Sequence, residues 1–251
     1  MALLDISLQS IEIELTTQVL IIYPDHLFNK KDVKVLFLLH GYWGSHLDWL
    51  RNTNIEQLAN QYNLMVVMPS MNNSYYTNAV YGHNYFNYYA IELPNKIAGM
   101  FNLELAKENT YIAGLSMGGY GALKAALTKP DQYQGVASFS GALDIISINQ
   151  TMSQRKNKNI GIFGDEETFI KNRKIHDLLI LTDNIKNQDL DIYVSCGTED
   201  FLYEHNTKFH EHLNNLKIEH KYVERKGDHN WIFWAEEIKT ALEFFFSKEK
   251  N

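Results

Sequence analysis

The stretch 109-NTYIAGLSMGGYGALKAALTK-129 decides the fold of this chain. Residues 111–113 have the apolar character of a buried strand, and residues 122–127 are good helix-forming sequence that stops at Lys129-Pro130. Ser116 therefore falls at the turn from a strand into a helix, inside the pentapeptide Gly-Leu-Ser-Met-Gly. This is the context of a nucleophile elbow, and it predicts a serine hydroxyl that projects toward a substrate.

The residues around Ser116 fit that interpretation. Gly114 and Gly118 lack a Cβ atom, so the backbone can turn sharply and hold Ser116 in a strained conformation. The following helix points its amino terminus at the same spot, so the Met117 N–H is an expected oxyanion donor. The pentapeptide alone is a weak signal, because chance produces it in about one chain in ten of this length. The interpretation therefore depends on partners elsewhere in the chain.

Length and composition are those of an ordinary globular protein. The 251 residues are 45% hydrophobic and 21% charged, with a net charge of −7, so a single domain over residues 1–251 is expected. No broad Lys/Arg cluster is present, and a nucleic-acid partner is not expected. Neither a signal peptide nor a run of eighteen apolar residues occurs, which predicts a cytoplasmic protein without a membrane span. The single cysteine, Cys196, lies in an apolar run and is expected in the core.

Strand and helix patterns alternate along most of the chain. Two alternating segments, 8–14 and 18–23, are expected to pair antiparallel at a sheet edge. Further strands are expected at 33–39, 64–68, 135–140, 191–196 and 220–224, and helices at 49–62, 85–101 (with a kink at Pro94), 175–181, 203–216 and 231–248. With the strand before Ser116, this pattern predicts an α/β fold with an eight-stranded, mostly parallel sheet and helices on both faces.

The segment 144–171 interrupts the alternation. It is polar and longer than a tight connection, and we interpret it as an irregular cap over the carboxyl edge of the sheet. The alternative is a solvated surface insertion.

A serine nucleophile needs a histidine that takes its proton and a carboxylate that orients the histidine. Asp200 follows the strand at 191–196, and His229 follows the strand at 220–224, in the order Ser, acid, His. Asp228 competes as the acid because it adjoins His229, but a side chain next to the histidine is directed away from its ring. The sequence therefore favours Ser116, Asp200 and His229 as the catalytic residues.

Other candidates fall around this triad. The Tyr42 N–H, on the loop HGYWG after the third strand, is expected as the second oxyanion donor. His40 is expected to be structural, whereas for His46 and His83 substrate contact and surface exposure are equally favoured. His210 and His212 point in different directions on a helix that also carries His205, which argues against a metal site. The aromatic residues expected as pocket walls, with core packing as the alternative, are Trp43, Tyr75, Tyr76, Trp231 and Trp234.

With these residues in view, the chain resembles the esterase D superfamily and, within it, the small tributyrin esterases. The segments that carry the resemblance run nearly end to end: LHGYWGSHLDWL, VVMPSMNNSYYT, YGHNYF, IAGLSMGGYGALKAAL, SFSGALD, CGTEDFLYEHN and GDHNWIFW. The resemblance implies an α/β-hydrolase fold, hydrolysis of short-chain acyl esters, no cofactor or metal, and self-association as a homodimer or homotetramer. It places the catalytic roles on Ser116, Asp200 and His229, with Tyr42 and Met117 as oxyanion donors.

The superfamily also contains S-formylglutathione hydrolases, feruloyl esterases and mycolyl transferases, so a thioester substrate is an alternative to a short-chain ester. A further alternative, from another class, is a noncatalytic binding protein with a hydrolase fold. The order of Ser, Asp and His argues against it.

Overall fold

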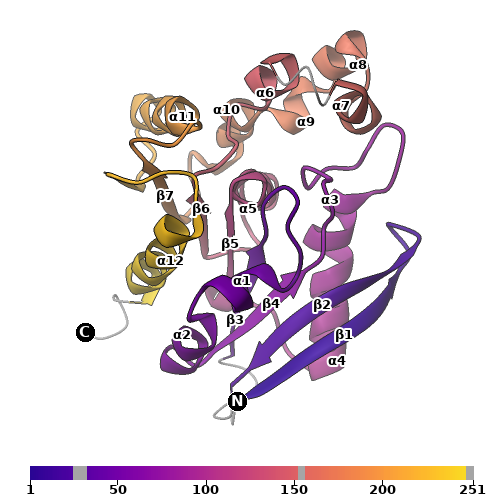
Figure 1. The fold of residues 1–251 in the computed structure, drawn as a ribbon, viewed down its shortest axis with the longest axis vertical. Coiled ribbons are helices and arrows are strands. Elements are labelled where there is room, and N and C mark those ends of the chain that lie inside the picture. The colour runs from indigo at the N-terminus through magenta and orange to yellow at the C-terminus, as the bar shows by residue number, and fades with distance from the viewer. Residues whose placement is uncertain (25–32, 152–155, 247–251) are drawn as a thin grey trace.

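The computed structural model describes residues 1–24, 33–151 and 156–246, and one eight-stranded sheet runs through it (Figure 1). The strand order is β1-β2-β4-β3-β5-β6-β7-β8. The pairs β1–β2 and β2–β4 are antiparallel, and all other neighbours are parallel, which confirms the predicted sheet. The strands are β1 (Ala2–Ser10), β2 (Leu15–Tyr23), β3 (Lys34–Leu39), β4 (Leu64–Pro69), β5 (Thr110–Leu115), β6 (Gly135–Phe139), β7 (Asp191–Gly197) and β8 (Lys221–Arg225).

Helices cover both faces of the sheet. They are α1 (Asp48–Asn52), α2 (Ile55–Gln61), α3 (Tyr85–Asn87), the π-helical turn η1 (Tyr88–Glu92), α4 (Leu93–Phe101), the 3-10 turn η2 (Lys107–Asn109), α5 (Met117–Thr128), α6 (Ile145–Thr151), α7 (Lys156–Phe163), α8 (Glu166–Lys171), α9 (Arg173–His176), α10 (Leu178–Leu181), the 3-10 turn η4 (Thr182–Ile185), α11 (Tyr203–Asn215) and α12 (Trp231–Phe246). Within the described ranges, none of these helices combines the length and apolarity that crossing a membrane requires.

The sheet separates two apolar cores, and β3 shows why. Its side chains are buried on both faces: Val35 and Phe37 belong to the core that contains residues of α4, α5 and α11, whereas Leu36 and Leu38 belong to the core that contains residues of α1, α2 and α12. A strand buried on both sides needs a continuous apolar sequence, because successive side chains point to opposite faces. The central run KVLFLL therefore sets the three-layer arrangement.

The amino-terminal hairpin differs from the prediction. The first strand is β1, residues 2–10, and not 8–14, because the chain turns at residues 11–14 and Ser10 pairs with Leu15. Glu14 takes a positive φ of 52° in this turn. The Glu92 carboxylate of η1 accepts hydrogen bonds from the Ser10 hydroxyl and from the Ile11 and Glu12 N–H groups. A contact eighty residues away in sequence thus fixes the turn, and the local alternation did not reveal it.

The predicted long helices are also interrupted. Thr53 separates α1 from α2 with an extended backbone, and its hydroxyl donates to the Trp49 carbonyl oxygen. Pro94 lies in the first turn of α4, directly after η1. Proline has no N–H for the helical ladder, which accounts for the local shift to π-type bonding. Residues 247 and 248 of the predicted last helix lie outside the described residues.

The segment 144–171 is helical, so the prediction of an irregular stretch was wrong. It contains α6, α7 and α8, which lie with α9 at one edge of the molecule, beyond the ends of β5 and β6 (Figure 1). Two of these helices begin with a side-chain cap: the Asp144 carboxylate accepts a hydrogen bond from the Ser147 N–H, and the Asp165 carboxylate accepts one from the Thr168 N–H. In a polar segment such aspartates do not stand out as caps. Residues 152–155 of the segment lie outside the described residues.

A buried polar cluster joins α5 to these helices. The Lys124 ammonium donates to the Thr77 hydroxyl, whose oxygen lies 3.3 Å from His176 Nδ1. Burial lowers the pKa of Lys124 to about 7 and the pKa of His176 to about 3, the latter with a smaller contribution from Lys124. The stability of the fold therefore depends on pH through both groups.

Candidate active site

Ser116 lies on the turn between β5 and α5, with a strained backbone (φ 53°, ψ −117°). The two flanking glycines permit this turn because of what surrounds them. A Cβ on Gly114 would lie 2.4 Å from the Gly118 backbone, and a Cβ on Gly118 would lie 2.6 Å from the carbonyl oxygens of Leu39 and His40 on the β3 chain. The elbow is thus packed backbone against backbone, which keeps the Ser116 side chain at the carboxyl edge of the sheet.

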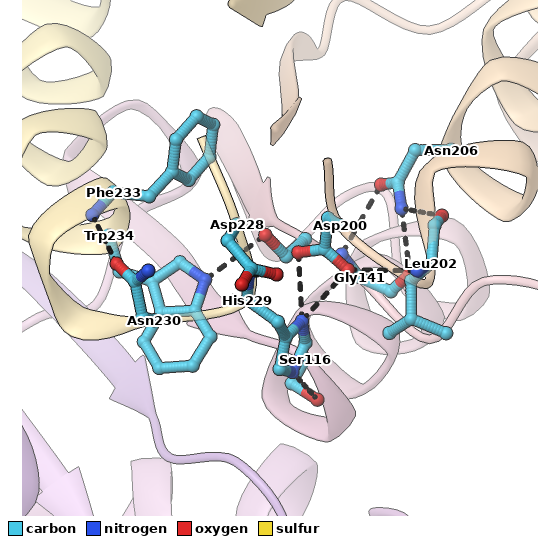
Figure 2. A network of polar contacts seen from close by, with 11 residues as sticks. Ser116, Gly141, Asp200, Leu202, Asn206, Asp228, His229, Asn230, Phe233 and Trp234 are labelled. Carbon is cyan, nitrogen blue, oxygen red and sulfur yellow. Dashed lines mark hydrogen bonds and ion pairs between the residues drawn. The ribbon is translucent and has the colours of Figure 1, made fainter. Parts of the chain in front are cut away.

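His229 and Asp200 meet Ser116 at this edge (Figure 2). His229 Nε2 lies 3.1 Å from Ser116 Oγ, and its Nδ1 lies 2.8 and 3.0 Å from the two carboxylate oxygens of Asp200. The Asp200 side chain is fully buried, whereas that of His229 is 17% exposed. The structure therefore brings the three residues together in one hydrogen-bonded line that a substrate can reach from the serine end.

Asp228, the competing acid, is directed elsewhere. Its carboxylate is exposed and accepts a hydrogen bond from the His229 backbone N–H at 2.7 Å. Asp200 reaches the imidazole because β7 and β8 are parallel neighbours, so the loops after them leave the sheet side by side. The carboxylate that contacts the ring is thus the one expected from strand order.

The loop that carries Asp200 is anchored at several points. The Leu202 N–H donates to Asp200 Oδ1 at 2.8 Å. The fully buried Asn206 amide donates to the carbonyl oxygens of Leu202 and Gly141, and its oxygen accepts from the Gly141 N–H (Figure 2). Asn206 therefore joins the loop after β7 to the loop after β6, which fixes the acid relative to the serine.

Two aromatic rings flank the imidazole of His229. The Trp234 ring stands edge-on to it at 4.9 Å between centroids, and the Trp234 Nε1–H donates to Ser140 Oγ. The Phe201 ring makes the second contact with the imidazole, at 4.6 Å between ring centroids. Phe201 is 65% exposed. One ring is held in the core and the other stands in solvent.

The expected oxyanion donors lie beside Ser116. Met117 is the first residue of α5, where a backbone N–H has no partner within the helix. Tyr42 lies on the loop after β3 and lines the same cavity as Ser116 and Met117. Trp43 follows with a φ of +66°, and its N–H donates to Asn73 Oδ1 at 2.7 Å, which fixes this loop.

A cavity of about 200 Å³ opens over Ser116. Of the predicted wall residues, Trp43 and Tyr75 line it. Sequence reasoning missed further lining residues. The position of Phe201 and Leu202 directly after Asp200 could have indicated that they lie near the site. Ala142 and Ile148 lie between β6 and the end of α6, and no sequence pattern marks them as lining residues. The complete lining is Tyr42, Trp43, Tyr75, Ser116, Met117, Ala142, Ile148, Phe201, Leu202 and His229.

Three predicted wall residues, Tyr76, Trp231 and Trp234, do not line this cavity, and neither does His83, for which substrate contact was one of two interpretations. Tyr76 is fully buried behind it, and its hydroxyl donates to the His40 carbonyl oxygen at 2.8 Å. Trp231 packs edge-on against Trp49 and Trp234. His83 lies in the loop before α3, next to Tyr85. Aromatic composition alone did not separate walls from core, because both environments favour large flat side chains.

His40, His46 and His210 have structural surroundings. His40 is buried, its Nδ1 lies 2.7 Å from the Gly41 carbonyl oxygen, and its Nε2 accepts the Met71 N–H, so the ring is neutral with its proton on Nδ1. Burial lowers the pKa of His40 accordingly. His46 lies 3.5 Å from Asp5, and His210 contacts His220. Among the described residues, no group of three or more His, Cys, Asp or Glu side chains is arranged to hold a metal ion.

An eight-stranded sheet of this order, with a serine on a strained strand-to-helix turn, defines an α/β-hydrolase. Comparison with known proteins is more specific. Residues 10–245 match the model of the Esterase family, described as "Putative esterase". An acetyl esterase from Caldicellulosiruptor saccharolyticus is 33% identical over 260 residues, which cover 97% of this chain and 98% of that protein. The chain belongs to this esterase family.

Solved structures agree with the family. FphF, a fluorophosphonate-binding serine hydrolase of Staphylococcus aureus, has a TM-score of 0.88 and 30% identity over 97% of this chain and 98% of its own. The S-formylglutathione hydrolase FrmB of the same organism has a TM-score of 0.83 and 29% identity, with the same coverage. The esterase resemblance and the α/β-hydrolase fold expected from the sequence are confirmed.

Proposed function

We propose that this protein is a serine carboxylesterase that hydrolyses short-chain acyl esters through an acyl-enzyme, in the manner of a tributyrin esterase. The observation that carries the proposal is the continuous contact from Ser116 Oγ through His229 to the buried Asp200 carboxylate. Each of the three groups has the chemistry that its position requires.

In the first half-reaction, Ser116 Oγ attacks the ester carbonyl carbon while His229 Nε2 takes its proton. Asp200 accepts the Nδ1–H and stabilises the imidazolium that forms. The backbone N–H groups of Tyr42 and Met117 bind the oxyanion of the tetrahedral intermediate. When the carbon–oxygen bond to the alcohol breaks, His229 gives the proton to the leaving oxygen, and the acyl group stays on Ser116.

In the second half-reaction, a water molecule takes the place of the alcohol. His229 removes its proton, the hydroxide oxygen attacks the acyl carbon, and the same two backbone groups bind the oxyanion. Collapse of the intermediate returns the proton to Ser116 Oγ and releases the carboxylic acid. The cycle uses no cofactor.

The size of the cavity supports a short acyl group. Its volume of about 200 Å³ lies below the roughly 300–1,000 Å³ of pockets for drug-sized ligands. Ile148 of α6 lines it and is almost fully buried, so the segment 144–171 contributes to its wall. We propose that this segment is the cap that limits chain length, and we expect acyl groups of about two to six carbons to react faster than long fatty acyl groups.

A thioesterase is the second candidate, because the structure is similar to S-formylglutathione hydrolase FrmB. A panel that pairs short-chain oxygen esters with their thioesters, including S-formylglutathione, separates the two. Preference for oxygen esters supports the carboxylesterase, and preference for S-formylglutathione supports the alternative. Faster hydrolysis of long-chain esters than of butyrate would contradict the proposed cap.

Labelling with a fluorophosphonate probe tests the nucleophile. Ser116→Ala should abolish labelling and nearly all turnover and leave the protein folded, because only the projecting hydroxyl is lost. Ser7→Ala, the same change on β1, serves as the matched control and should label like the wild type. Labelling retained in the Ser116 variant would place the nucleophile elsewhere, and a wild type that neither labels nor turns over would support a noncatalytic protein.

A further inference from the structure

The side chains at the rim of the cavity are exposed to solvent, whereas those of its interior are buried. Most of the lining is buried apolar side chain, including Met117, Ile148 and Leu202. Phe201 and Trp43 line the same cavity but are 65% and 79% exposed. Large aromatic side chains standing in water at the mouth of a cavity gain stability when a ligand covers them.

The position of Phe201 relative to His229 identifies the part of the substrate that it meets. In acyl transfer, His229 Nε2 gives its proton to the leaving oxygen, so the alcohol lies next to the imidazole when the bond breaks. The Phe201 ring is in contact with that imidazole, at 4.6 Å between centroids and an angle of 54°. The leaving alcohol and the exposed Phe201 ring therefore meet the same imidazole.

Charges beside the acid and the base favour an uncharged alcohol. Glu199 precedes Asp200, and Asp228 precedes His229; both carboxylates are exposed. The Lys226 ammonium lies 3.8 Å from the Glu199 carboxylate and offsets only that charge. These three flanking side chains are net negative and would repel an anionic alcohol or thiol.

We propose that Phe201, with Trp43 at the same mouth, is the binding surface for the alcohol part of the ester, and that this alcohol is uncharged and aromatic. The inference rests on the proposed esterase function and narrows its substrate class. A short acyl group fills the closed end of the cavity, and the aromatic ring of the alcohol stacks on Phe201 at the open end.

Kinetics with two acetate esters test this assignment. Benzyl acetate and ethyl acetate carry the same acyl group and differ in the aromatic ring of the alcohol. Phe201→Ala should lower kcat/KM for benzyl acetate about tenfold and for ethyl acetate by no more than about twofold, because only the first loses a stacking partner. Hydrolysis of the acetyl-enzyme, measured in single-turnover experiments, should be unchanged, because the alcohol has already left.

Three further measurements sharpen the test. Phe201→Tyr keeps a flat ring and should retain the preference for benzyl acetate. Ile232→Ala is the matched control, because Ile232 is 82% exposed near His229 but does not line the cavity. A 4-carboxybenzyl ester should react more slowly than benzyl acetate in the wild type.

The outcomes separate this inference from the proposed function. If Phe201→Ala slows both esters equally and also slows deacylation, the ring only positions His229 and the inference is overturned. If it changes neither ester by more than about twofold, Phe201 binds no part of the substrate. A wild type that hydrolyses neither acetate would instead overturn the proposed function.

Discussion

Replacing Asp200 with asparagine tests the geometry at the base of the active site. In the wild type, Asp200 Oδ1 accepts the Leu202 N–H at 2.8 Å, while Oδ2 lies 2.8 Å from His229 Nδ1. In the Asp200→Asn variant, the Leu202 N–H holds the amide oxygen at the first position, which leaves the amide NH₂ facing Nδ1. The imidazole must then accept at Nδ1 and carry its proton on Nε2, where it cannot take the proton of Ser116.

The expected loss follows from that tautomer. The equivalent substitution in serine proteases lowers kcat about 10⁴-fold with the geometry intact. We expect kcat to fall by about a thousandfold or more here, which corresponds to about 4 kcal/mol of transition-state stabilisation. Because asparagine has the shape of aspartate, the thermal unfolding of the variant should show a folded protein.

Asp228→Asn provides the matched control. Asp228 is exposed, and its carboxylate accepts a hydrogen bond from the His229 backbone N–H. An asparagine oxygen can accept the same bond. Its kcat on a short-chain acyl ester should fall by about tenfold or less. If the Asp228 variant is crippled while the Asp200 variant works, the assignment of the acid is refuted.

Three predictions concern stability. The pKa of His176 is about 3 in the folded chain and about 6.5 in the unfolded chain, so below pH 7 the unfolded chain binds more protons. The free energy of unfolding of the wild type should therefore fall by about 2 kcal/mol between pH 7 and 5. Urea unfolding of His176→Phe should show a smaller loss, and an equal loss would contradict the reasoning. The pKa of Lys124 is about 7 in the folded chain and about 10.4 in the unfolded chain, so between these values the unfolded chain binds more protons and the free energy of unfolding should rise by about 2 kcal/mol from pH 7.5 to 9.5. Lys124→Met should lack this rise. A rise that persists in the variant would exclude Lys124 as its cause. Gly118→Ala places a Cβ 2.6 Å from two β3-chain carbonyl oxygens and should cost about 1–3 kcal/mol with a loss of activity; a wild-type melting temperature would show that the elbow has room.

The sequence by itself determined the central strands of the sheet and predicted the positions of the candidate catalytic residues along the chain. Strands buried on both faces need continuous apolar runs, and KVLFLL and TYIAGL are such runs. The glycines around Ser116 are a local requirement of the turn, so they are visible as a motif. The order of Ser116, Asp200 and His229 follows from the order of parallel strands, because each strand delivers its loop to the same edge.

The sequence did not determine the helices of the segment 144–171 or the walls of the cavity. The caps at Asp144 and Asp165 look like ordinary polar residues until the backbone around them is folded. Whether an aromatic residue is wall or core depends on the elements packed around it, as Tyr75 and the adjacent Tyr76 illustrate. The cytoplasmic location and the homodimer or homotetramer stay predictions from the sequence.

The sequence favoured Asp200 by strand order, and the tertiary structure shows the contacts that turn its carboxylate to the imidazole; only the tertiary structure decided which ring stands beside that imidazole in solvent. Asp228 adjoins His229 in sequence, whereas the Asp200 carboxylate is hydrogen-bonded to the His229 ring. The loops after β7 and β8, with the Asn206 amide holding the first of them, turn the Asp200 carboxylate inward. The Asp228 side chain turns instead to the backbone that follows it. Side-chain direction depends on contacts between segments distant in the chain, and a sequence pattern does not record those contacts.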